Sequence, residues 1–79
     1  MKTLIRLRQE VFLTQSALAA ACNVSKQTVW DWEHGYSRPT PENLRKLVEV
    51  LGKPVSDVLD ALDLAERKRE EQGKERPAA

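Results

Sequence analysis

The stretch TQSALAAACNVSKQTVWDWEHG, residues 14–35, decides the fold. Its first threonine can accept hydrogen bonds from the free N–H groups of a helical turn, and the alanine-rich run that follows has high helix propensity. Asn23 predicts the end of this helix, because asparagine tolerates positive φ. Ser25 is a good N-cap for a second helix, which Gly35 should end. The stretch therefore predicts two short helices joined by a tight turn.

Three more helices are predicted around this pair from apolar side chains at helical spacing. One over residues 3–11 precedes the pair, with its leucines on one face. Downstream, TPE at residues 40–42 places a cap, a proline at the first helical position and an acid in the first turn. Gly52 closes that helix. A last helix begins near Pro54 and keeps its apolar stripe as far as Leu64. The sequence shows no strand-like alternation.

The chain has 79 residues, which is one domain at most. We expect residues 1–64 to form the helix-turn-helix domain, because the apolar pattern ends there. The segment 65–79 is expected to be a charged helix extension followed by a disordered tail. Residues 65–71 are charged and would extend the last helix, whereas residues 73–79 contain glycine and proline and no core side chain.

Composition says less about function than pattern does. The net charge is +1, with +2 over residues 1–38 and −1 over residues 39–79, which by itself does not indicate nucleic-acid binding. One cysteine excludes an intrachain disulfide and fits a reducing cytosol. The sequence has no apolar run of about 18 residues and no secretory signal pattern. We therefore expect a cytoplasmic protein without membrane contact.

An enzyme finds no support in the sequence. His34 is the only histidine and sits near a helix C-terminus, where imidazole is a routine partner of the helix dipole. Cys22 lies at an apolar position with no second thiol, so a buried, inert thiol is expected. No glycine-rich phosphate loop and no metal-ligand cluster is present. The sequence predicts no catalytic site, no metal and no cofactor, and no small-molecule ligand is evident.

Pieces of the chain, in order and at unbroken spacing, resemble the Cro/CI-repressor (XRE-like) helix-turn-helix family of bacterial and phage regulators. The resemblance covers about residues 4–62. It implies an all-α fold: a compact five-helix bundle with a helix-turn-helix, of the lambda-repressor-like DNA-binding kind. The pieces that carry it are TQSALA (14–19), VSKQTV (24–29), WEHG (32–35), RP (38–39), the leucine-rich run 44–52 and VL (58–59).

The resemblance implies that the helix after Ser25 enters the major groove of double-stranded DNA as the recognition helix. Gln15 would meet a phosphate and brace the start of that helix. Gln27 would pair with adenine, and Lys26 would donate to guanine or to phosphate. The hydroxyls of Ser25 and Thr28 would reach phosphate, besides the capping role of Ser25.

Further positions are implied less directly. Asp31 matches a position that reads bases in some relatives, where an acid suits cytosine. Trp30 should face outward, to touch a thymine methyl, contact a protein, or pack partly on its own domain. Ser37 and Arg38 lie in a loop that runs along the DNA backbone in the family. Asn43 lies at a helix N-terminus, which favours phosphate.

Two further sets of positions concern structure. Arg8 and Glu33 resemble a family pair that forms a partly buried structural ion pair. Three positions depart from the family: Asn23 stands where glycine is common, Phe12 is larger than the usual occupant and is expected to be exposed, and Pro54 replaces the usual cap of the last helix.

The family's scheme predicts a homodimer that reads a near-palindromic operator as a sequence-specific transcriptional regulator in the nucleoid. A repressor, which blocks the polymerase, is the first interpretation, and an activator, which recruits it, stays open. The rival hypothesis is an antitoxin-like or other protein-protein interaction module on the same fold. A basic concave face around Lys26, Gln27 and Arg38 would favour DNA. An apolar patch around Phe12 and Trp30 would favour a protein partner.

Overall fold

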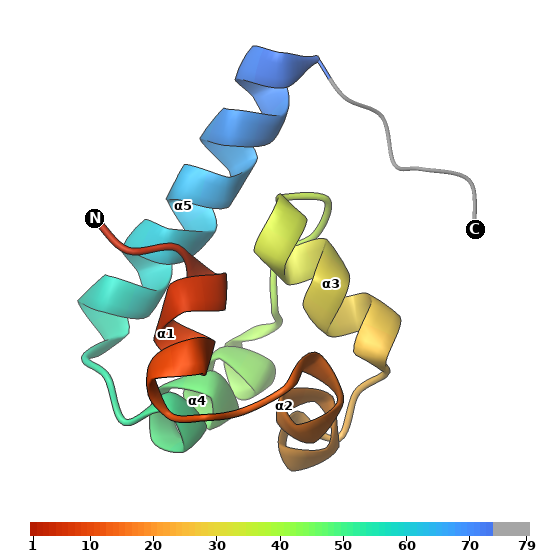
Figure 1. The fold of residues 1–79 in the computed structure, drawn as a ribbon, viewed down its shortest axis with the longest axis vertical. Coiled ribbons are helices and arrows are strands. Elements are labelled where there is room, and N and C mark those ends of the chain that lie inside the picture. Colours follow the sequence, from red (N-terminus) through yellow and green to blue (C-terminus); the bar gives the residue numbers. More distant parts are fainter. Residues whose placement is uncertain (74–79) are drawn as a thin grey trace.

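A computed structural model describes residues 1–73 of the chain, and residues 74–79, in the segment predicted to be disordered, lie outside the described part. Five helices follow one another with no strand among the described residues (Figure 1). The predicted all-α, five-helix fold is confirmed. The helices are α1 (Leu4–Glu10), α2 (Gln15–Cys22), α3 (Lys26–His34), α4 (Pro41–Leu51) and α5 (Val55–Gln72).

Local capping chemistry sets most helix ends, as the sequence predicts. The hydroxyls of four N-cap residues each accept a hydrogen bond from a backbone N–H in the first turn, which satisfies one of its free donors. Asn23, at the end of α2, takes the left-handed conformation expected of it. α5 starts at Pro54 without any side-chain cap. The four capping residues are Thr3, Thr14, Ser25 and Thr40.

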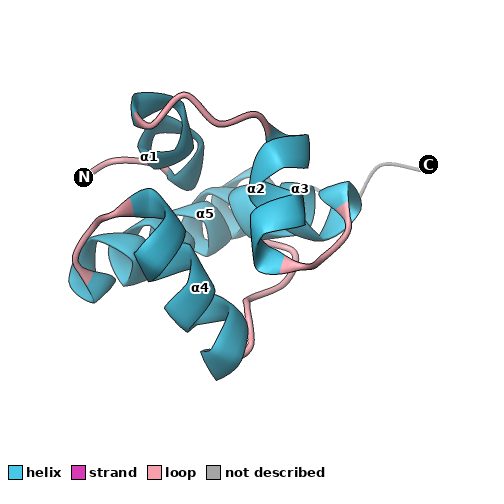
Figure 2. Ribbon diagram, turned by 90° about the horizontal axis from the view of Figure 1, so that it is seen from below, coloured by secondary structure: helices cyan, strands magenta, loops and turns pink. Residues whose placement is uncertain are grey.

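The core lies where α3 meets its neighbours. Trp32, only 2% exposed, is the largest side chain there. α3 packs against α2 and α5, while α1 also contacts α5 and α4 contacts α2. In Figure 2, α5 passes between α1 and α4, and the α2–α3 pair lies at one end of the molecule. The apolar side chains of α3 are thereby covered, and its polar first turn is left to solvent.

α5 approaches the end of α3 so closely that only glycine fits at position 35. A Cβ built on Gly35 would lie 2.5 Å from the carbonyl oxygen of Ala65, and its φ is +82°. Arg69 Nε donates to the Gly35 carbonyl oxygen at 2.7 Å. The domain boundary that the sequence predicts after residue 64 thus falls inside one continuous helix, α5. The second half of this helix contacts the C-terminus of α3.

Phe12 carries backbone strain without any packing to compensate for it. Its φ is 61°, in the left-handed region, and its side chain is 94% exposed. That conformation costs an L-residue about 1–2 kcal/mol. Glycine avoids the cost, although its larger freedom in the unfolded chain offsets part of the gain.

We expect Phe12→Gly to raise the free energy of unfolding by about 1 kcal/mol in urea denaturation, because it removes the strain. Phe12→Ala is the matched control: it removes the exposed ring but keeps a strained L-residue, so its stability should stay near that of the parent. Equal stability of the glycine and alanine variants would contradict the strain argument.

Candidate nucleic-acid interface

The first turn of α3 presents polar side chains to solvent on a firmly held backbone. Ser25, Lys26 and Gln27 are exposed and Thr28 is half-buried, whereas Val29, on the opposite side, is fully buried. The Ser25 hydroxyl accepts a hydrogen bond from the Thr28 N–H at 3.1 Å and shares another with the Thr28 hydroxyl at 2.8 Å. This turn can therefore offer donors and acceptors to a ligand without first having to become ordered.

Gln27 is oriented by a neighbour one turn further along α3. Its Nε2 donates to Asp31 Oδ1 at 3.1 Å, and Asp31 is only 8% exposed. A primary amide has two N–H donors and a carbonyl acceptor, so this bond uses one donor only. Asp31, which the resemblance implies as a base reader, is placed to hold Gln27.

A buried carboxylate ties α3 to α1 and α2. Glu33, whose side chain is 0% exposed, accepts from Arg8 Nε and from Gln15 Nε2, each at 2.6 Å. Arg8 also donates to the Leu13 carbonyl oxygen at 2.9 Å. The structure thus brings together the two residues implied as an ion pair and adds Gln15, whose amide braces the recognition helix from the start of α2.

Arg38 is held by two carboxylates on α5. Its Nη1 donates to Glu66 Oε1 at 2.6 Å and to Asp63 Oδ1 at 2.9 Å, both on α5. Burial lowers the pKa of Arg38, but the hydrogen bonds to these two carboxylates outweigh it and raise that pKa. Ser37, in the loop before α4, and Asn43, in the first turn of α4, are the other implied backbone contacts, and both are half-buried. Their neighbour Arg38 is already paired in the free domain.

Trp30 belongs to an aromatic cluster that the sequence analysis missed. Its ring stacks on His34 with centroids 4.0 Å apart and lies 5.7 Å from the Tyr36 ring. His34 Nδ1 is 2.8 Å from the Trp30 carbonyl oxygen, and Arg69 lies over Tyr36 at 5.3 Å. The i, i+4 spacing of Trp30 and His34 was a usable signal for the first contact. The contacts to Tyr36 and Arg69 had none.

The single cysteine lies in the core. Cys22 is fully buried, and burial raises the pKa of its thiol, which favours the unreactive protonated form. Within residues 1–73, no group of histidine, cysteine and acidic side chains is placed to hold a metal ion. None of the described helices is long and apolar enough to cross a membrane.

Two helices joined by a tight turn, with the second presenting an exposed polar first turn, define a helix-turn-helix domain of the DNA-binding class. A family model described as Helix-turn-helix matches residues 4–58, and the chain belongs to that family, the Cro/CI/XRE type. Its members are DNA-binding transcription regulators. Comparisons with curated proteins and with solved structures gave no match.

Removing Arg8 tests the buried network. Arg8→Ala leaves the Glu33 carboxylate buried and without its cation, so we expect a loss of about 3–5 kcal/mol in the free energy of unfolding. Arg6→Ala is the control on the same helix, because the Arg6 side chain is 66% exposed and should matter little. Similar, small losses in the two variants, measured by urea denaturation, would refute the bracing role of Arg8.

Proposed function

We propose that this domain reads a near-palindromic operator as a homodimer and acts there as a transcriptional repressor in the nucleoid. The observation that carries the proposal is the exposed, hydrogen-bonded first turn of α3, on a helix that Glu33 ties to α1 and α2. A major groove admits one α-helix, and its base edges present the donors and acceptors that such a turn can match. The family supplies DNA as the partner.

Base reading falls to Gln27 and Lys26. The Gln27 amide keeps one N–H and its carbonyl oxygen for the N7 and N6 groups of adenine. Lys26 is exposed beside it and donates to guanine or to a phosphate. Contacts to the DNA backbone fall to residues around this turn and to the loop that leads into α4, which position the domain without specifying sequence. These residues are Gln15, Ser25, Thr28, Ser37, Arg38 and Asn43.

The geometry of DNA sets the spacing that two paired copies of the domain would need. Two recognition helices read one face of a duplex when they lie about 34 Å apart, one helical turn. The surface proposed for pairing is α5 with the loop before it, where Val55 is 49% exposed. A dimer seated on a promoter blocks access of the polymerase.

Selection of bound sequences from a random duplex library, at about 100 mM salt, tests the function. Enrichment of a short inverted repeat supports a dimeric operator reader, and enrichment of a single half-site supports DNA reading but contradicts the dimer. A folded helical protein that enriches no sequence contradicts the proposal and moves attention to a protein partner.

Gln27→Ala should weaken binding to the selected sequence by about 1–3 kcal/mol and relax the preference at one base position. Gln9→Ala, the same change on an exposed site of α1, is the matched control and should leave both properties unchanged. Affinity and a repeated library selection measure the two effects. An unchanged base preference in Gln27→Ala would remove Gln27 from the base-reading set.

The carboxylates of Asp63 and Glu66 neutralise the charge that Arg38 would offer to a phosphate. The double variant Asp63→Asn/Glu66→Gln should therefore bind DNA more tightly and with a salt dependence steeper by about 0.9 in log–log slope, equivalent to one added phosphate contact. The control Glu70→Gln/Glu71→Gln removes the same charge from exposed sites on the same helix. Equal affinities and slopes in the two double variants would show that Arg38 does not contact DNA.

A further inference from the structure

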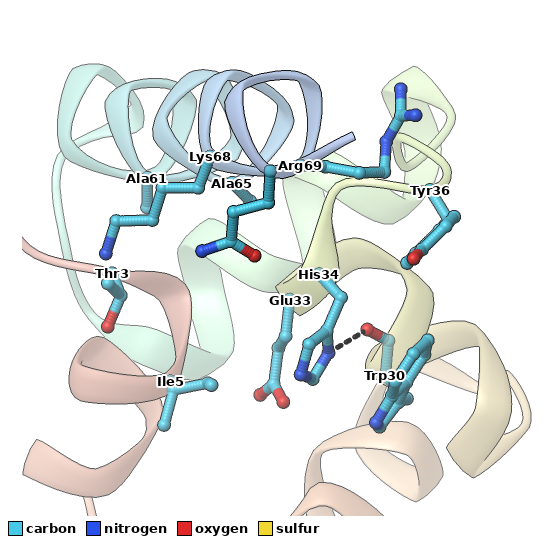
Figure 3. A pocket seen from close by; sticks show the side chains of 11 residues that line it. Thr3, Ile5, Trp30, Glu33, His34, Tyr36, Ala61, Ala65, Lys68 and Arg69 are labelled. Carbon is cyan, nitrogen blue, oxygen red and sulfur yellow. Dashed lines mark hydrogen bonds between the residues drawn. The ribbon is translucent and has the colours of Figure 1, made fainter. Parts of the chain in front are cut away.

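A cavity of about 320 Å³ lies between the start of α1, the second half of α3 and the second half of α5 (Figure 3). Small-molecule sites in proteins have volumes of about 300–1,000 Å³, so one or two rings would fill it. The exposed first turn of α3 contributes none of its lining residues. The cavity is therefore distinct from the proposed DNA-reading surface, although both depend on α3.

The walls of the cavity suit a flat ring. His34 and Trp30, stacked in parallel with centroids 4.0 Å apart, give one wall a ring face. Across from them α5 contributes Ala61 and Ala65, whose short side chains leave the space open, and α1 contributes the aliphatic Ile5. Offset stacking of a third ring on such a pair is favourable, by about 0.5–1.5 kcal/mol for aromatic pairs in proteins.

The charges around the cavity favour an anion. Its one acidic lining residue, Glu33, has both carboxylate oxygens engaged by Arg8 and Gln15. α5 adds two cations, Lys68 and Arg69. Lys68 is exposed and pairs with no carboxylate within residues 1–73. In Figure 3 its side chain extends from α5 towards Thr3.

We propose that this cavity binds a small planar aromatic carboxylate, with its ring on His34 and its carboxylate on Lys68. The ligand would contact α3 and α5 together, at the point where Arg69 already joins them through the Gly35 carbonyl. The domain would then carry an effector site of its own. Nothing in this inference requires that the domain bind DNA.

The test is a titration of the ¹⁵N-labelled chain followed by NMR, with three probes of similar size. Benzoate has both the ring and the charge, benzamide lacks the charge, and cyclohexanecarboxylate lacks the aromatic ring. We expect benzoate to shift the indole N–H of Trp30 and the amides of α5 around Lys68. The indole N–H of Trp32, which is buried in the core and does not line this cavity, should shift little.

Benzoate should bind about fivefold more tightly than either other probe, as expected for one exposed charge pair or one ring contact of up to about 1 kcal/mol. Lys68→Gln should remove the advantage over benzamide, whereas Arg67→Gln, its exposed neighbour outside the lining, should keep it. His34→Ala should remove the advantage over cyclohexanecarboxylate. Equal binding of the three probes would overturn the proposal, and so would equal binding by the two α5 variants. The expected Kd for benzoate is about 1 mM, and the absence of shifts at Trp30 up to 20-fold above that concentration would also overturn it.

Discussion

The carboxylate of Glu33 is the group on which the arrangement of α1, α2 and α3 depends. Its side chain is excluded from solvent, and burying a charge is costly unless the charge is paired and hydrogen-bonded. Arg8 and Gln15 meet that requirement from two other helices, at 2.6 Å each. An arrangement that separated α3 from α1 or α2 would leave this buried charge without a partner, so the network favours the observed packing of the three helices.

The C-terminus of α3 is also fixed by a second constraint, which is steric. Gly35 allows the backbone of α5 to approach to a distance that any Cβ would prevent. Arg69 then uses the carbonyl group that this approach brings within reach. Glu33 and Gly35 lie two positions apart, so charge pairing and close contact act together at the C-terminal end of α3.

The fold could be predicted from the sequence because its signals are local. Thr3, Thr14 and Thr40 cap their helices through backbone groups a few residues away. The left-handed conformation of Asn23 could be predicted from its residue type alone. The site could be predicted only in part. The partnership of Arg8 with Glu33 spans 25 positions and was implied only by resemblance to a family.

Contacts that neither local pattern nor resemblance covers were missed. Arg38 pairs with carboxylates 25 and 28 positions away, on a helix face that sequence alone marks only as charged. The same holds for Arg69, whose contacts with Gly35 and Tyr36 depend on how far α5 extends. The charge pattern of residues 65–71 indicated a solvated helix, but which of its side chains would turn back onto α3 is set by packing geometry and not by composition.

The small number of unpaired cations on the domain bears on how it would recognise DNA. Arg38 is neutralised within the domain, and the exposed first turn of α3 carries a single cation, Lys26. Affinity that comes from phosphate neutralisation is independent of sequence and weakens as salt rises. A chain with net charge +1 has little of it, so we expect its binding to depend on hydrogen bonds from side chains that are already ordered in the free domain. The bond from Gln27 to a buried Asp31 is such a preparation, because it restricts the amide before any base is met.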